Sequence, residues 1–276
     1  IRLYESQGLW FELADILDSR LAQLGDEDPN RANTLMRLGE VREVRLGESE
    51  LAMENYRQVS AIDPENGAVR AALERLLEDP IHRVASADML EPLYEADDNW
   101  RGLLGVYQIQ VDSSSDAVRQ VARLHLMADV HLARAEAPVD AFLSCVAAFG
   151  VNPADVRTHE RLKDMATALG AWQELIDVYS AELDNIAEPE VLADIHRRLA
   201  RVFADELADE EQALMHFEAA QAADRDDVEV LNALEALYTR LNRWDDLVGL
   251  LRQKVDGLED ASDRLALHRR IGQLYD

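Results

Sequence analysis

The side chains that could bind a metal ion do not form a known ligand pattern in this sequence. His125 and Asp129 are four residues apart, a spacing that places two ligands on one face of a helix. No third ligand accompanies them, and no two histidines are four residues apart. The acidic stretches 26–28 and 224–227 lack the glycine and the distal glutamate of a calcium loop, so capping of the next helix explains them better. We therefore expect no metal ion and no cofactor.

The only cysteine, Cys145, could act as a nucleophile, but no activating base can be assigned to it. Its place in an apolar helical pattern predicts a buried, small hydrophobic side chain. The sequence also has no glycine-rich phosphate loop, serine elbow or paired-histidine motif. We therefore predict that this protein is not an enzyme.

The charge of the chain excludes several classes of partner. Its 276 residues include 55 acidic and 28 basic ones, a formal net charge of −27. Such a surface repels phosphate, so we expect no nucleic-acid partner, and no apolar run is long enough for membrane insertion. The bias towards alanine, arginine and leucine suggests a bacterial gene. Because the sequence begins with Ile1, its compartment is not fixed: the cytoplasm is favoured and the periplasm stays open.

Four tryptophans mark an internal repeat. They stand at 10, 100, 172 and 244, so the last two intervals are 72 residues and the first is 90. Each is followed by a leucine three residues later and by leucine or tyrosine seven residues later, the spacing of one helix face. This register predicts that the indoles pack between helices, with Trp172 and Trp244 mostly buried.

A second segment alternates with the tryptophan segment. Residues 36–77 align without a gap on residues 197–238, an offset of 161, and a shift of 72 finds a further copy. The longer repeat therefore contains two helix pairs of about 36 residues each. Small residues such as Ala52 and Ala213 occupy equivalent positions and should let helices approach closely.

These positions resemble the tetratricopeptide repeat family. Gly39, Ala52, Tyr56 and Pro64 hold the places of its small, aromatic and proline residues, with one additional residue in the turn near Gly47. The resemblance covers nearly the whole chain and is strongest to long bacterial arrays. It implies an all-α fold, a right-handed α-solenoid of antiparallel helix pairs, which binds other proteins or peptides.

The turn signals place sixteen helices. The long first tryptophan interval predicts an extra helix after residue 79, so we divide the array into 1–79 and 80–276, with the second part continuing the same solenoid. Pro92 should kink this extra helix or mark its start. The expected helices are 1–7, 9–24, 30–46, 49–61, 66–78, 83–97, 99–112, 116–135, 138–149, 154–169, 171–185, 189–207, 209–223, 227–241, 243–257 and 262–276. The pattern at both ends predicts that the array continues beyond them.

The resemblance implies that the first helix of each pair lines a concave, partner-binding surface. Its groove-facing offsets fall on the predicted contact residues Glu40, Glu43, Asp129, Glu160, Asp164, Arg197, Arg201, Asn232, Arg240 and Arg269, and also on Asn33, Met36, Asp88, His125, Asp194 and Gln273. The earlier positions are acidic and the later ones are rich in arginine. We therefore expect an acidic segment of a partner to bind along residues 190–273.

The preferred interpretation is a scaffold for protein–protein interaction within a larger assembly. One alternative is a regulatory or sensor array attached to a catalytic or signalling domain outside this sequence. Another is an acidic array that captures a basic protein by charge.

Overall fold

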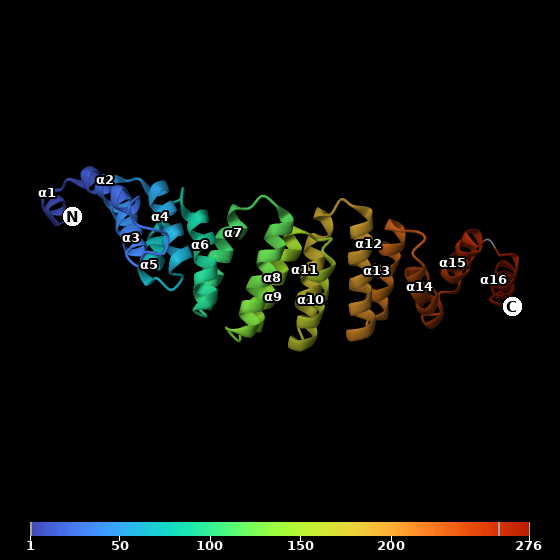
Figure 1. The fold of residues 1–276 in the computed structure, drawn as a ribbon. Coiled ribbons are helices and arrows are strands. Elements are labelled where there is room, and N and C mark those ends of the chain that lie inside the picture. The colour runs from blue at the N-terminus through green and yellow to red at the C-terminus, as the bar shows by residue number, and fades with distance from the viewer. Residues whose placement is uncertain (1, 259, 276) are drawn as a thin grey trace. The chain divides into compact units, whose positions relative to one another are not determined.

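The computed structural model describes residues 2–258 and 260–275, and throughout those ranges every regular element is a helix (Figure 1). The all-α prediction is confirmed. The chain divides into two compact units, which meet in sequence between Val151 and Asn152. Each of the sixteen expected helices has a counterpart, but their expected ends at Ile1 and Asp276 lie outside the described residues.

The first unit contains nine helices among its described residues, and consecutive helices pack on each other. A short π-helical turn, η1 (Arg42–Leu46), follows α3. The helices are α1 (Arg2–Gln7), α2 (Trp10–Leu21), α3 (Arg31–Val41), α4 (Ser49–Ile62), α5 (Gly67–Leu76), α6 (Arg83–Ala96), α7 (Trp100–Ser113), α8 (Ala117–Ala133) and α9 (Pro138–Val151).

The second unit repeats this arrangement in its seven described helices, with a 3-10 turn, η2 (Leu183–Asn185), and a second π-helical turn, η3 (Val202–Glu206). Figure 1 shows α12 and α13 running side by side as one such pair. The helices are α10 (Val156–Leu169), α11 (Trp172–Glu182), α12 (Pro189–Arg201), α13 (Glu210–Ala223), α14 (Val228–Arg240), α15 (Trp244–Gly257) and α16 (Ala261–Gln273).

The π-helical turns account for the additional residue expected near Gly47. In such a turn an N–H group bonds to the carbonyl five residues back, so the helix takes in one more residue than an α-helical turn does. Leu207 N–H donates to the carbonyl of Val202 across 3.2 Å in this way. A residue with positive φ follows each turn, Gly47 at 70° directly after η1 and Ala208 at 54° two residues after η3.

Two turns of the repeat use left-handed backbone. One is the turn that contains Gly47 and Ala208, and Glu136, with φ 51°, occupies the equivalent position in a third copy of the repeat. The other lies two residues before each tryptophan. Its four members are Gly8, Asp98, Gly170 and Asn242, with φ between 56° and 70°. Equivalent positions therefore keep the same backbone even where the residue is not glycine, so the repeat period, not the side chain, dictates these turns.

The core is built from small residues facing large ones. Ala52, Ala213 and Cys145 have no exposed surface, which confirms the burial expected for Cys145. Tyr56 is also fully buried, and it packs where Gly39 has no side chain. Close approach of the helices therefore depends on residues that lack bulk.

The expected burial of the tryptophans is wrong for Trp244, whose exposed fraction is 43%. Trp172 is only partly buried. Helices α11 and α15 begin at these tryptophans. Because a helical side chain lies over the turn that precedes its own Cα, no turn of the same helix lies under these indoles. The core is closed instead by the leucines three and seven residues later, Leu247 and Leu251, which are 1% and 0% exposed.

Two alternatives were expected for Pro92 in the helix after residue 79: a kink within the helix, or the start of the helix. Helix α6 begins at Arg83 and contains Pro92, so the proline does not mark its start. Helices α5 and α6 pack on each other within the first unit. The observed boundary after Val151 is a different division from the one expected at residue 80, and the division into 1–79 and 80–276 stays a prediction.

Candidate partner-binding pocket

The second unit contains a pocket of about 330 Å³ between α10, α11, α12 and η3. Helix α10 contributes polar side chains, α11 an apolar and aromatic wall, and the end of α12 with η3 contributes charged residues. The lining consists of His159, Glu160, Lys163, Trp172, Leu175, Tyr179, Arg198, Arg201, Val202, Asp205 and Glu206. Trp172 is the first residue of α11, is only partly buried and lies at this pocket.

Two buried aromatic side chains in the lining, His159 and Tyr179, are uncharged at neutral pH. The Nε2 atom of His159 lies 2.9 Å from the carbonyl oxygen of Pro153, which can only accept, so Nε2 carries the proton. Nδ1 then accepts from the hydroxyl of Tyr179 across 3.0 Å. Burial lowers the pKa of His159 to about 4, and the neighbouring Arg198 adds to this, while burial raises the pKa of Tyr179.

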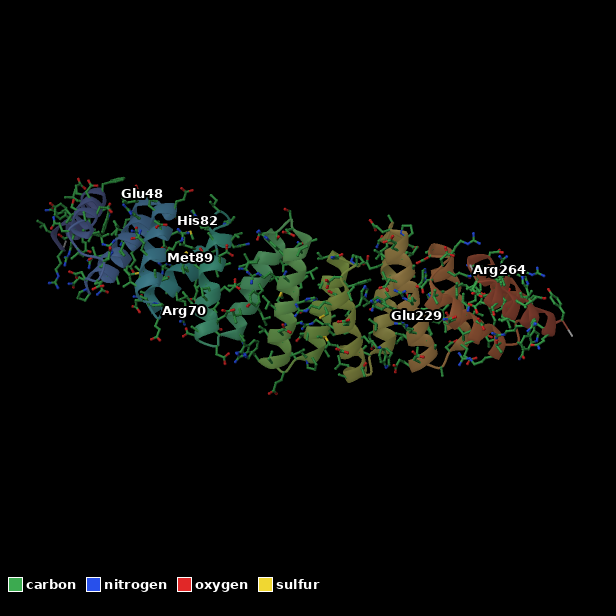
Figure 2. The ribbon with its side chains drawn as sticks, turned by 45° about the vertical axis from the view of Figure 1, so that its right-hand side comes forward. Glu48, Arg70, His82, Met89, Glu229 and Arg264 are labelled. Atoms are coloured by element: carbon green, nitrogen blue, oxygen red, sulfur yellow. The ribbon has the colours of Figure 1, made fainter. Side chains whose placement is uncertain are left out.

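The rim carries charges of both signs, but the two arginines are already paired. Arg198 Nε lies 2.6 Å from Asp194 Oδ2, and Arg201 pairs with Glu229, which Figure 2 labels. Neither carboxylate belongs to the pocket lining. The lining carboxylates Glu160, Asp205 and Glu206 form no ion pair with any described residue, so Lys163 is the remaining cation beside them.

The first unit holds an equivalent pocket beside Trp10. It has a volume of about 630 Å³ and is lined by Glu5, Trp10, Arg37, Glu40, Val41, Val44, Arg45 and Arg75. Five of these residues, at 37, 40, 41, 44 and 45, align under the offset of 161 with five lining residues of the pocket beside Trp172. The site is therefore a recurrent feature of the repeat, between a tryptophan helix and the first helix that follows it.

The two pockets differ in the residue at one aligned position, 45 in the first unit and 206 in the second. In the first unit the guanidinium of Arg45 lies 4.7 Å from the centroid of the Trp10 ring, a cation–π contact. The aligned residue in the second unit is Glu206. In the described part of the chain, no cation lies over the ring of Trp172.

The structure brings some of the predicted contact residues to these pockets. Glu160 and Arg201 line the pocket beside Trp172, and Glu40 lines the one beside Trp10. Asp129, Asp164 and the remaining C-terminal candidates do not line either one. Arg269 is exposed on α16, and Asn232 accepts a hydrogen bond from Lys254 across 2.7 Å.

Several predicted contact residues are engaged within the chain. The carboxylate of Glu43 accepts from the hydroxyl of Tyr56 at 2.6 Å and pairs with Arg75 at 3.0 Å. Arg240 pairs with Glu210 at 3.2 Å. Arg197 pairs with Asp194 and, at 2.6 Å, with Asp227. All but the Arg197–Asp194 pair, which lies within α12, connect different elements of the chain. The expected acidic partner segment along residues 190–273 stays a prediction.

Two of the groove-facing assignments are wrong. Met36 and His125 are 8% and 3% exposed, so neither lies on a binding surface. Their helices, α3 and α8, are packed by the helices before and after them. The helices that pack on α3 and α8 therefore cover the side chains of Met36 and His125.

Lys163, Asp205 and Glu206 line the pocket but were not predicted from the sequence. The signal that could have found them is the alignment of residue 45 with residue 206, where arginine changes to glutamate within an otherwise matching segment. Over residues 2–258 and 260–275, no group of three or more histidine, cysteine, aspartate or glutamate side chains could hold a metal ion. None of the helices in those ranges combines the length and the apolar character needed to cross a membrane.

Comparison with known proteins identifies the repeat. Residues 230–265, which hold most of α14 and all of α15, match the family described as tetratricopeptide repeat. No curated protein matches the sequence.

Among solved structures, the chain is similar to Naa15/Naa10 bound to HypK-THB, with 13% identity over 99% of this chain and 37% of that one, and a TM-score of 0.40. It is also similar to a tetratricopeptide repeat protein from Parabacteroides merdae, with 11% identity over 99% and 95% of the two chains and a TM-score of 0.31. A human IFIT1 dimer with m7Gppp-AAAA shares 14% identity over 97% of this chain and 68% of its own, with a TM-score of 0.40. None of these similarities transfers a function to this chain.

Proposed function

Since this chain is a tetratricopeptide repeat protein, matched over residues 230–265, we propose that it binds partner proteins or peptides within a larger assembly. The contact surface is the one formed by the first helices of its pairs. The observation that carries the proposal is the pocket between α10, α11 and α12, which is lined by the partly buried Trp172, by Glu160 and by Arg201. Partly exposed tryptophan and arginine are the residue types that most often dominate protein interfaces.

The dimensions and charge of the pocket favour a side chain of a protein over a nucleotide. Its volume of about 330 Å³ lies at the lower end of the range for ligand pockets, about 300–1,000 Å³, and suits one large side chain. The chain's net charge of −27 disfavours the approach of phosphate groups. A partner that inserts a side chain beside Trp172 would extend along the exposed ridge of α10, which includes Asp164.

A site-specific photocrosslinking experiment tests this proposal. The photoreactive residue benzoylphenylalanine replaces Asp164 on α10 in one variant and Met215 on α13, which is 50% exposed, in a matched control. After irradiation in the native cell, we expect a discrete protein adduct from position 164 and none from position 215. Adducts from position 215 alone would mean that second helices carry the interface, and the proposal would have to be abandoned.

A further inference from the structure

The chain itself shows which group fits beside a tryptophan of this repeat. Arg45 lies over Trp10 at 4.7 Å, and Arg101 lies over Trp100 at 4.2 Å. The residue that follows Trp172, at the place of Arg101, is Gln173. Both positions that supply a guanidinium in the other copies therefore hold uncharged or acidic residues beside Trp172.

Three carboxylates line the pocket beside Trp172. Glu206 occupies the position from which Arg45 reaches Trp10, and Asp205 and Glu160 line the same pocket. In the pocket beside Trp10, Arg37 pairs with Glu5 and Arg75 pairs with Glu43, which leaves Arg45 and Glu40 in balance. In the second unit, Asp194 and Glu229 engage the rim arginines, which leaves a net negative site.

We infer that the pocket beside Trp172 binds the guanidinium of an arginine side chain from a basic segment of a partner protein. This inference rests on the proposed function and specifies the partner's chemistry at the same site. The guanidinium stacks on the indole and donates to Glu206 and its neighbouring carboxylates, as a planar group with several donors can do. A lysine ammonium, which is more strongly hydrated and cannot stack, binds more weakly. The polarity is opposite to the one that the sequence predicts for residues 190–273.

A peptide titration of the whole chain tests this inference. The probe is acetyl-Gly-Arg-Gly-Arg-Gly amide, compared with its lysine counterpart and its citrulline counterpart, which keeps the shape of arginine without the charge. Binding is followed by the indole N–H signals in proton–nitrogen correlation spectra, and the Trp172 signal is assigned by its loss in Trp172→Phe. We expect a saturable shift of this signal with the arginine peptide, at least threefold weaker binding of the lysine peptide and no saturable shift with citrulline. A shift of the same size with citrulline, or none with arginine at millimolar concentration, overturns the inference.

The substitution Glu206→Arg provides a second test, because it installs the residue that covers Trp10 in the first unit. We expect the Trp172 signal to move without peptide and the affinity for the arginine peptide to fall at least tenfold. The charge-matched control is Glu50→Arg, at an exposed position on α4 in the first unit, which should keep the affinity of the unmodified chain. Equal losses in both variants would indicate non-specific charge attraction and overturn the inference.

The two proposals fail separately. Adducts from position 164 together with no response to the arginine peptide would retain the binding surface and reject the guanidinium. A specific response of Trp172 without adducts from position 164 would retain the pocket chemistry and reject the proposed surface along α10.

Discussion

Gly39 faces Tyr56 so closely that a Cβ atom on Gly39 would lie 2.5 Å from Cε1 of the tyrosine ring. The ring cannot yield easily, because Tyr56 is fully buried and its hydroxyl donates to Glu43 across 2.6 Å. Contact between α3 and α4 therefore requires a residue without a side chain at this point.

Gly39→Ala should consequently lower the free energy of unfolding by about 1–3 kcal/mol, the usual cost of overpacking a core. Urea unfolding followed by circular dichroism measures the change. Gly105→Ala in α7 is the matched control, since no atom lies within 4 Å of the Cβ that it would add. It should raise stability by up to about 1 kcal/mol through helix propensity. Equal destabilisation by both substitutions would contradict the proposed role of Gly39.

The left-handed turns after the π-helical segments give a reciprocal pair of substitutions. Ala208 has a φ of 54° and its equivalent Gly47 has a φ of 70°. Ala208→Gly should stabilise the protein by up to about 1 kcal/mol, and Gly47→Ala should destabilise it by about 1 kcal/mol, because a Cβ is strained in this region. Thermal unfolding of the two variants measures both signs. Changes in the same direction would mean that the backbone strain does not control stability at these turns.

The buried histidines predict a loss of stability in mild acid. Burial lowers the pKa of His159 and of His216 to about 4, from 6.5 in the unfolded chain. Well above pH 6.5 neither state binds the proton, so there is no penalty. As the pH falls from 6.5 to 4 the unfolded state binds protons first, so each histidine destabilises the fold by about 3 kcal/mol in total, and by about 2 kcal/mol at pH 5.

Free energies of unfolding in urea at pH 7.5 and pH 5 measure this dependence. His159→Gln should remove about 2 kcal/mol of the difference between the two pH values, because glutamine does not titrate. The unmodified chain, measured at the same two pH values, is the reference. An unchanged pH difference in His159→Gln would show that its proton affinity is ordinary.

The exposure of Trp244 predicts that this tryptophan contributes little to stability. Trp244→Ala should cost about 1 kcal/mol, because 43% of the side chain is already in solvent. Leu247→Ala, three residues later and 1% exposed, should cost about 2–5 kcal/mol. Chemical unfolding of the two variants compares them directly. A larger loss of unfolding free energy in Trp244→Ala than in Leu247→Ala would mean that the indole contributes more to the core than the leucine does.

Helix positions were predictable because hydrophobic spacing repeats. The repeat intervals and the turn signals between them placed sixteen helices, and comparison with the family spacing placed the additional residue near Gly47. The exposure of Trp244 was not predictable in this way, since spacing identifies a helix face but not how far a residue at the first helical position projects beyond it.

The candidate site was predictable in part. Family offsets selected Glu160 and Arg201, which line the pocket. They could not reveal that Arg201 pairs with Glu229, because those residues are 28 positions apart and lie on different helices. Which charges stay available to a partner depends on such pairs between neighbouring helices, and a single sequence contains no direct record of them.

The π-helical turns η1 and η3 have a consequence for how such a pocket can arise or vanish. One additional residue rotates everything after it by about 100° around the helix axis, which is the angle per residue in an α-helix. Arg45 and Glu206 both lie within these turns, so their placement beside a tryptophan depends on the insertion. Removing one residue would turn position 45 or 206 away from the indole without altering any side chain of the pocket. A change in residue number within these turns therefore moves position 45 or 206 relative to the indole, and a change in residue type there decides which charge the chain places beside it.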